Sequence, residues 1–352
     1  MGCHTRPASP SGSRCRRSRW CAGSRSGCSH SPGRASRSPF CGAWTTRASR
    51  LRTPLRAFAR CPARSSRSRS RSRHLRPLLS PASLKGVLDA DAAAAALARG
   101  FRDAGVAATE LPVADGGEGT TEVLRNALGG EWRHARVPDP LGRAISSRWL
   151  VLPDGRAVVE AAAAIGLPLL APAELDPLRA SSRGLGELVL AALDERPASL
   201  VVALGGSATV DGGAGMREVL AELPLATVAL VDVRTRLADA ARLFGPQKGA
   251  SPKDVELLEE RLRGIDELRP FAELPGSGAA GGLGAAFAAL GAELVAGAPA
   301  VLDLLRFDAH LGRADLVVTG EGTVDDTTAE GKAPGEVARR ALAAGVRCVV
   351  FG

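Results

Sequence analysis

The fold class is decided by the segment Ser199-Leu-Val-Val-Ala-Leu-Gly-Gly-Ser-Ala-Thr-Val-Asp-Gly-Gly-Ala-Gly215. Its first six residues form a short, mainly apolar run that ends at two glycines, which is typical of a buried β-strand. The glycines that follow permit a tight turn and a close approach of the backbone to a ligand. We therefore predict a buried strand over 199–204 that runs directly into a glycine-rich loop.

The same alternation of structure extends on both sides of this segment, from about Leu78 onward. A helix over 91–102 is predicted to begin at Asp89, whose short carboxylate suits an N-cap. Pro153-Asp-Gly155 lies between two apolar runs and indicates a β-hairpin. The other predicted strands cover 110–114, 227–233, 314–319 and 347–351, and the other predicted helices cover 120–128, 184–193, 252–263, 281–294 and 336–344. Strands that alternate with helices predict an α/β fold with a largely parallel sheet.

Residues 1–76 differ in composition from the rest of the chain. They hold 19 of the 46 Lys and Arg residues and no Asp or Glu, which leaves 27 basic and 37 acidic side chains in 77–352. The remainder is therefore acidic, with a net charge of −10, although the whole chain carries +9. A segment with so little apolar periodicity is expected to be disordered.

Three interpretations of this segment compete. The Arg-Ser run over 64–73 could bind RNA electrostatically, and the absence of acidic residues could mark an organelle transit peptide. We favour the third, in which 1–76 is non-native translation from a start codon assigned too early. Nucleic acid is then a partner only through this tail.

Cysteines and apolar runs bear on the compartment. Six of the seven cysteines precede residue 77 without the paired CxxC spacing of zinc sites, and only Cys348 lies beyond it. A body with one cysteine suits the reducing cytoplasm. No apolar run approaches the roughly 20 residues that span a bilayer. Because the sequence stops at a predicted strand, we also expect further C-terminal sequence to be missing.

Four glycine-rich segments adjoin predicted strands or helices: 115–120, 205–215, 276–284 and 320–325. Backbone N–H groups in such loops, together with the positive end of a helix, suit phosphate or carboxylate groups. Three of the loops carry acids that could hold Mg²⁺ or position a hydroxyl, namely Asp115, Glu118, Asp211, Glu321 and Asp325. Lys85, Arg183, Lys248 and Lys332 adjoin glycine and suit an anion clamp. For any single loop, a plain turn remains the competing interpretation.

Other enzyme motifs are absent or out of context. The sequence contains no GxxxxGK[ST] P-loop and no GxSxG nucleophile elbow. Gly276-Ser-Gly-Ala-Ala-Gly281 matches the dinucleotide fingerprint GxGxxG, but no clean buried strand precedes it. An enzyme that uses ATP would therefore need a scaffold other than the P-loop fold.

Seven motifs, in this order, resemble the class I glycerate kinase family: 80–86, 112–120, 182–188, 205–216, 244–250, 278–285, and 319–322 with 331–332. The resemblance implies an α/β fold of two domains. A Rossmann-like three-layer domain would be built from 77–134 and 285–352, with a mixed α/β domain inserted at 135–284. The implied reaction transfers the γ-phosphoryl group of ATP, with Mg²⁺, to D-glycerate. The product is 2-phosphoglycerate in many members and 3-phosphoglycerate in others, and we favour the former.

Roles for individual residues follow as hypotheses within this resemblance. We assign catalysis to Asp115, Asp211, Lys248 and Asp325, and substrate binding to Lys85, Ser182 and Arg183. Nucleotide binding is assigned to Gly205, Gly206, Ser207, Thr209, Gly281 and Gly282, and metal binding to Asp211 and Glu321. All these residues are expected to meet in one cleft.

One stretch departs from the family pattern. Val231-Asp-Val-Arg-Thr-Arg-Leu237 stands where the family usually has Cys-Asp-Val-x-Asn-Pro-Leu. Two alternatives therefore stay open: a family member with impaired catalysis that still binds nucleotide or organic acid, and a kinase for another small hydroxy acid. The oligomeric state is not specified by the sequence.

Overall fold

The computed structural model describes residues 75–324, 328 and 331–352. All of them belong to one compact unit, Arg69–Gly352. The predicted disorder of 1–76 concerns residues that lie, except for 75 and 76, outside the described part. The catalytic candidate Asp325 also lies outside it.

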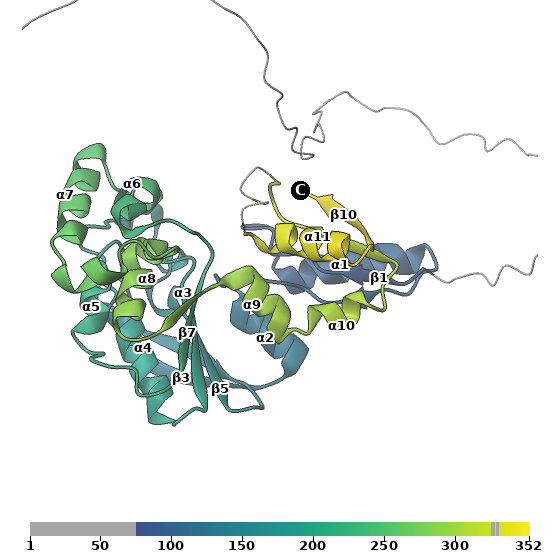
Figure 1. Cartoon of the computed structure of the whole chain (residues 1–352), viewed down its shortest axis with the longest axis horizontal. Helices are drawn as coiled ribbons and strands as arrows, with labels where there is room; N and C mark the ends of the chain where they lie inside the picture. The colour runs from purple at the N-terminus through teal and green to yellow at the C-terminus, as the bar shows by residue number, and fades with distance from the viewer. Residues whose placement is uncertain (1–74, 325–327, 329–330) are drawn as a thin grey trace, which may run out of the picture. The chain divides into compact units, whose positions relative to one another are not determined.

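The strands form two sheets (Figure 1). A four-stranded sheet has the order β10-β9-β1-β2, and a six-stranded sheet runs from β3 to β8 in sequence order. The strands are β1 (Pro77–Leu79), β2 (Thr109–Glu110), β3 (Glu131–Pro138), β4 (Ala144–Val151), β5 (Arg156–Glu160), β6 (Ser199–Ala203), β7 (Thr227–Val231), β8 (Glu293–Ala296), β9 (Leu316–Gly320) and β10 (Arg347–Phe351).

Helices connect most of these strands. They are α1 (Ala90–Asp103), α2 (Thr120–Leu128), α3 (Ala161–Ile165), α4 (Arg183–Asp194), α5 (Ala214–Arg217), α6 (Ala240–Phe244), α7 (Pro252–Arg263), α8 (Ala279–Ala289), α9 (Gly297–Leu304), α10 (Phe307–Leu311) and α11 (Ala333–Ala343). Asp89 caps α1 as predicted, because its carboxylate accepts a hydrogen bond of 2.7 Å from the Ala92 amide. At the start of α8, Ala280, Gly281 and Gly282 are left-handed, so this segment is a tight turn that leads into the helix.

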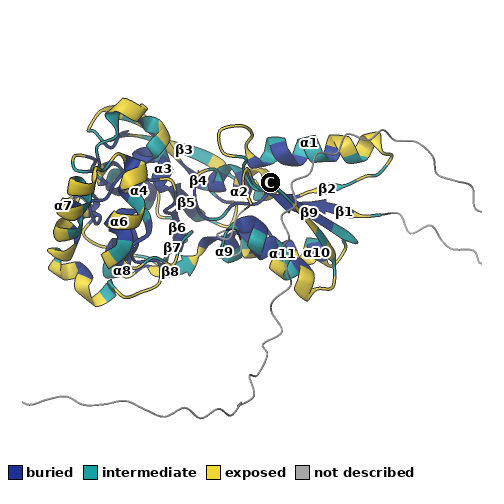
Figure 2. Ribbon diagram, turned by 90° about the horizontal axis from the view of Figure 1, so that it is seen from above, coloured by how far each residue is buried: buried dark blue, intermediate teal, exposed yellow. Residues whose placement is uncertain are grey.

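The four-stranded sheet is entirely parallel and draws strands from both ends of the described chain. Helix α1 lies on one face and α10 and α11 lie on the other, which gives three layers (Figure 2). The predicted α/β class, with a three-layer domain built from two distant segments and a second mixed domain between them, is confirmed.

The six-stranded sheet is mixed. β3, β4 and β5 pair antiparallel, whereas β5 to β8 pair parallel. Its strands extend from Glu131 to Ala296, beyond the predicted insert 135–284 at both ends. Along β5 and β6, alternate side chains join different cores, so the sheet is covered on both faces.

Helices α2 and α9 are shared between the two sheets. One core cluster holds Leu124 of α2 and Val301 of α9 together with Val158 of β5, Leu230 of β7 and Val317 of β9. A common apolar core therefore joins the sheets, and it places the amino ends of α2 and α9 beside the loops that follow β6 and β7. Figure 2 shows buried residues along the strands and on the inner helix faces, whereas α7 is mostly exposed.

Candidate active site

Glycine-rich loops after strands of both sheets meet at one point. The amide of Gly205, after β6, donates a hydrogen bond of 3.3 Å to the carbonyl oxygen of Gly116. A Cβ atom added to Gly205 would lie 2.7 Å from the Cα atom of Gly117, and one added to Gly297 would lie 1.9 Å from the carbonyl oxygen of Asp115. Side chains are excluded here because backbone packs on backbone. The loop 115–119, the loop after β6 and the start of α9 therefore pack together at one junction.

Four charged side chains gather at this junction, and we call Lys85, Asp115, Asp232 and Lys248 the charged centre. Burial raises the pKa of Asp232, and repulsion from Asp115 raises it further. The positive charges of Lys85 and Lys248 act in the opposite direction and lower that pKa. These residues come from four segments far apart in the sequence. The fold thus couples two carboxylates to two ammonium groups.

Lys248 is the buried cation of the charged centre, with 3% of its surface exposed. Its Nζ donates to the Ser207 hydroxyl at 3.1 Å and to the Thr209 carbonyl oxygen at 2.8 Å. Burial lowers the pKa of Lys248 to about 7, while the negative charges of Asp211 and Asp232 oppose that change. An additional anion bound nearby would favour its charged form.

Asp232 was not among the residues we assigned from the sequence. It follows β7 directly, and its Oδ2 atom lies 3.2 Å from the Cβ position that a side chain at Gly205 would need. One sequence signal could have identified Asp232. It is an acid near the carboxyl end of a predicted buried strand, and the preceding predicted strand leads into a glycine-rich loop. That edge is where open α/β sheets bind ligands.

Asp211 and Ser182 hold each other in place. The Asp211 carboxylate accepts hydrogen bonds from the amide and hydroxyl of Ser182 at 2.8 and 2.7 Å, and from the amides of Gly213 and Gly215 at 3.0 and 3.2 Å. The Ser182 hydroxyl accepts a bond of 2.9 Å from the Met216 amide. Asp211 is close enough to raise the pKa of Lys248. Both carboxylate oxygens of Asp211 therefore already accept hydrogen bonds from within the protein.

The predicted nucleotide loops lie against each other. The Gly212 amide donates a hydrogen bond of 3.0 Å to the Gly281 carbonyl oxygen, and a Cβ at Gly281 would lie 2.2 Å from the Thr209 carbonyl oxygen. A Cβ at Gly282 would lie 2.9 Å from the Cα atom of Gly212. Gly206 is exposed, with a left-handed φ of 81°. The buried Thr209 hydroxyl has no hydrogen-bond partner among the described residues. The two loops therefore pack against each other, and the Thr209 hydroxyl between them is available to a ligand.

The remaining assigned residues lie at other places in the structure. Arg183 is exposed and pairs with Glu187 at 2.8 Å and Glu218 at 3.2 Å. Glu321 accepts a hydrogen bond of 2.6 Å from Thr328 and lies 3.7 Å from the Lys332 ammonium. The loop of Glu321 adjoins the loop of Lys85, because a Cβ at Gly322 would lie 3.7 Å from the Lys85 amide nitrogen.

The donors at the charged centre suit a magnesium ion. Mg²⁺ prefers oxygen ligands and uses one or two carboxylates, with waters and substrate phosphates completing its shell. Asp115 and Asp232 supply two mutually repelling carboxylates. No group of three or more His, Cys, Asp or Glu that could hold a metal occurs in 75–324, 328 and 331–352. The set present thus fits a metal that arrives with phosphate and does not form a full protein cage.

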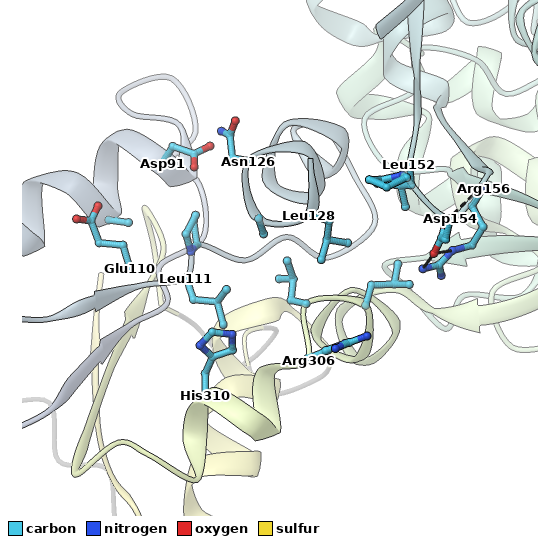
Figure 3. Close-up of a pocket in the computed structure, with 16 residues that line it drawn as sticks. Asp91, Glu110, Leu111, Asn126, Leu128, Leu152, Asp154, Arg156, Arg306 and His310 are labelled. Atoms are coloured by element: carbon cyan, nitrogen blue, oxygen red, sulfur yellow. Dashed lines mark hydrogen bonds and ion pairs between the residues drawn. The ribbon is translucent and has the colours of Figure 1, made fainter. Parts of the chain in front are cut away.

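A cavity of about 650 Å³ lies elsewhere (Figure 3). Its walls include Asp91, Leu111, Leu128, Arg306 and His310. Residues 126–128 and 304–305 place it at the carboxyl ends of α2 and α9, whereas the charged centre lies at their amino ends. None of the residues that we assigned to the site lines this cavity.

Comparisons with known proteins agree with the motifs. The sequence profile described as "Glycerate kinase family" matches residues 77–226 and 222–352. Glycerate 2-kinase of Escherichia coli (strain K12) is 39% identical over 302 aligned residues, which cover 73% of this chain and 79% of that protein. Glycerate kinase of Bacillus subtilis (strain 168) is 36% identical over 309 aligned residues, covering 75% and 81%.

A solved structure is also similar. The crystal structure of a protein from Salmonella typhimurium LT2 that carries the designation glycerate kinase 2 superposes with a TM-score of 0.67 at 35% identity. The superposition covers 78% of this chain and 86% of that chain. No helix in the described part of the chain is long and apolar enough to cross a membrane.

Proposed function

The chain belongs to the glycerate kinase family, and on that premise we propose that it transfers the γ-phosphoryl group of Mg²⁺-ATP to D-glycerate, with 2-phosphoglycerate as the product. The observation that supports this most strongly is the charged centre. At the carboxyl end of β7, Asp232 interacts with the charges of Asp115, Lys85 and Lys248, which come from three other segments of the chain. Phosphoryl transfer requires such a set to hold metal, substrate and transferring group.

We propose that Lys85 binds the carboxylate of glycerate, because it is the exposed cation of the charged centre. Lys248 would neutralise negative charge on the transferring phosphoryl group from its fixed position on the Thr209 carbonyl. A preorganised cation of this kind lowers the barrier because no solvent has to reorient during the reaction.

Asp115 would position the attacking hydroxyl and take up its proton, and Asp232 would hold the metal. Bound Mg²⁺ would supply charge neutralisation on the phosphates. We assign the metal to Asp232 in preference to Asp211, because Asp211 already accepts four hydrogen bonds within the protein. The unpartnered Thr209 hydroxyl and the amide groups of Gly206 and Ser207 would face the nucleotide phosphates. The roles predicted for Arg183, Glu321 and Asp325 stay predictions.

We further propose a cytoplasmic location, since ATP and a small hydroxy acid are substrates of that compartment and the described part carries one free cysteine, Cys348.

An assay of ADP release by the full chain tests the function. D-glycerate, L-glycerate, glycolate and lactate would be compared at saturating Mg²⁺-ATP, and ³¹P spectroscopy would identify the phosphorylated hydroxyl. We expect turnover with D-glycerate and a signal of 2-phosphoglycerate. Turnover with another acid alone would identify a different kinase, and nucleotide binding without turnover would identify an impaired family member.

A further inference from the structure

Glu160 is a buried carboxylate that the assigned chemistry does not use. It ends β5, and 6% of its surface is exposed. Its Oε1 accepts hydrogen bonds from the Thr121 amide at 2.5 Å and the Thr121 hydroxyl at 2.8 Å, and its Oε2 accepts one from the Gly119 amide at 3.3 Å. All three donors lie at the start of α2, some 40 residues earlier in the chain.

This contact replaces a cap that α2 lacks. The N-cap residue is Gly119, which has a left-handed φ of 87° and no side chain that could accept a hydrogen bond. The first amides of a helix have no partner within the helix and need an acceptor. An anion at this end also interacts favourably with the helix dipole. Glu160 satisfies both requirements from a different secondary-structure element.

The capped turn leads directly into the charged centre. The Thr120 hydroxyl donates to the Gly117 carbonyl oxygen at 2.7 Å. A Cβ at Gly117 would lie 3.2 Å from the Asp115 Oδ1 atom and 3.6 Å from the Gly205 Cα atom. The chain from Asp115 to Thr121 is thus fixed at one end by backbone packing and at the other by Glu160. Movement at Gly119 would displace Asp115 relative to Asp232.

Glu160 changes its protonation state near neutral pH. Burial raises the pKa of Glu160 to about 7, the amides and hydroxyl that donate to it lower this pKa, and the neighbouring Glu122 raises it. Glu122 itself is paired with Arg148, whose guanidinium lies 4.0 Å from the centre of the Trp132 ring. These are the charged groups that face Glu160 from α2 and β4.

We propose that Glu160 is a positioning residue for the transfer reaction: its side chain holds the Gly119–Thr121 turn and thereby fixes Asp115 in the charged centre. The inference rests on the proposed function for its effect on turnover. Its structural part, the hold on the turn, can be measured without any substrate.

The first experiment compares the full-length wild type with Glu160→Gln by hydrogen exchange, followed by mass spectrometry of peptides that cover 113–128. A glutamine keeps the shape, but its amide group would face the Gly119 amide, donor against donor. At pH 8 we expect this peptide to exchange at least tenfold faster in the variant than in the wild type. Unchanged exchange at pH 8 would overturn the proposal even if the enzyme proved inactive.

The second experiment measures kcat and KM for D-glycerate between pH 5.5 and 9. We expect kcat of Glu160→Gln to fall about 10- to 100-fold at pH 8 with KM within about threefold, because misplacement of a reacting group acts on the chemical step. Glu160→Asp should recover part of the lost kcat.

Controls separate positioning from general loss of structure. Thr121→Ser keeps both donors to Oε1 and should behave as wild type, whereas Thr121→Val removes one bond and should show a weaker form of the same defect. Ser147→Ala removes another side-chain bond in the same sheet, 2.7 Å to the Ala163 carbonyl oxygen. It should leave kcat and the exchange of the 113–128 peptides unchanged. If Glu160→Gln does not fold, Thr121→Val decides, and normal exchange together with normal kcat in that variant refutes the proposal.

Discussion

The ammonium group of Lys248 donates a hydrogen bond of 2.8 Å to the carbonyl oxygen of Thr209, 39 residues earlier in the chain. This bond fixes a buried positive charge beside the loop that follows β6, and burial lowers the pKa of that lysine to about 7. Replacement by methionine, Lys248→Met, should reduce kcat roughly 10²- to 10³-fold, as loss of a preorganised electrostatic group does. Lys253→Met on the exposed face of α7 is the matched control and should be neutral.

The same lysine should set the alkaline limb of activity. Because the protonated form is the useful one, kcat/KM should fall as the pH rises through about 7. Bound phosphates favour the charged form, so the limb for kcat should lie at higher pH than that for kcat/KM. Initial rates at low and saturating substrate between pH 6 and 10 check this, and identical limbs in both plots would argue against a phosphate neighbour for Lys248.

Asp232 is the carboxylate to which we assign metal binding. Asp232→Asn keeps the shape, removes the charge and relieves the repulsion from Asp115. We expect kcat to fall about 10²-fold or more and the Mg²⁺ concentration for half-maximal rate to rise. Asp239→Asn, a change in the following segment at a surface pair with Arg242, serves as the control. A variant Asp232→Asn with normal Mg²⁺ dependence would remove Asp232 from the metal site.

Gly205 tests the backbone junction. Gly205→Ala would place a methyl group 2.7 Å from the Gly117 Cα atom, and neither backbone can yield without moving the loop that carries Asp115. We expect a loss of stability of about 1–3 kcal/mol together with lower kcat. In contrast, Gly100→Ala in α1 meets nothing within 4 Å and should stabilise the protein by about 0.5–1 kcal/mol. Thermal and urea unfolding of both variants provides the comparison.

Two buried groups make stability depend on pH in opposite ways. The pKa of Glu160 is raised from 4.5 to about 7, so its contribution is fully present below about pH 4.5 and is lost as the pH rises through 7, at most about 3 kcal/mol. The pKa of Lys248 is lowered from 10.5 to about 7, so the unfolded chain binds more protons above pH 7 and stability rises toward pH 10.5.

Urea unfolding across pH 5–10 should therefore show that Glu160→Gln flattens the acidic side of the stability profile and Lys248→Met flattens the alkaline side. A variant whose profile parallels that of the wild type on its own side would show that the group titrates normally in the native state.

Local sequence signals predicted the elements that need no distant partner. Helix α7 begins at a Ser-Pro signal and α1 at an aspartate cap, and both were predicted almost to the residue. β3 carries alternating charged and half-buried residues at the edge of the sheet, and it was missed because it has no continuous apolar run. β8 was also missed. The predicted helix over 281–294 runs into its first residues, because alanines that favour helix continue up to Gly291-Ala-Glu293.

Local sequence signals also predicted part of the site. The glycine-rich loops can be recognised from sequence, because such a density of glycine is unusual. Asp232 directly follows β7 and Glu160 is the last residue of β5, and a single acid at the end of a strand is commonly a turn or cap residue. Their importance arises from Gly205, Lys248 and Thr121, which only the folded chain brings to them. Arg183 lies within the motif 182–188, but the fold pairs it with Glu187 on the surface.

The central claim is that the charged centre binds the metal ion, the nucleotide and D-glycerate at the same time. Crystals of the full chain with Mn²⁺, ADP and D-glycerate, examined by anomalous scattering, test it most directly. We predict a manganese peak in direct contact with a carboxylate oxygen of Asp232 or Asp115, with the nucleotide phosphates beside Lys248. A peak at another place, such as the cavity at the far ends of α2 and α9, with no nucleotide at the charged centre, would contradict it.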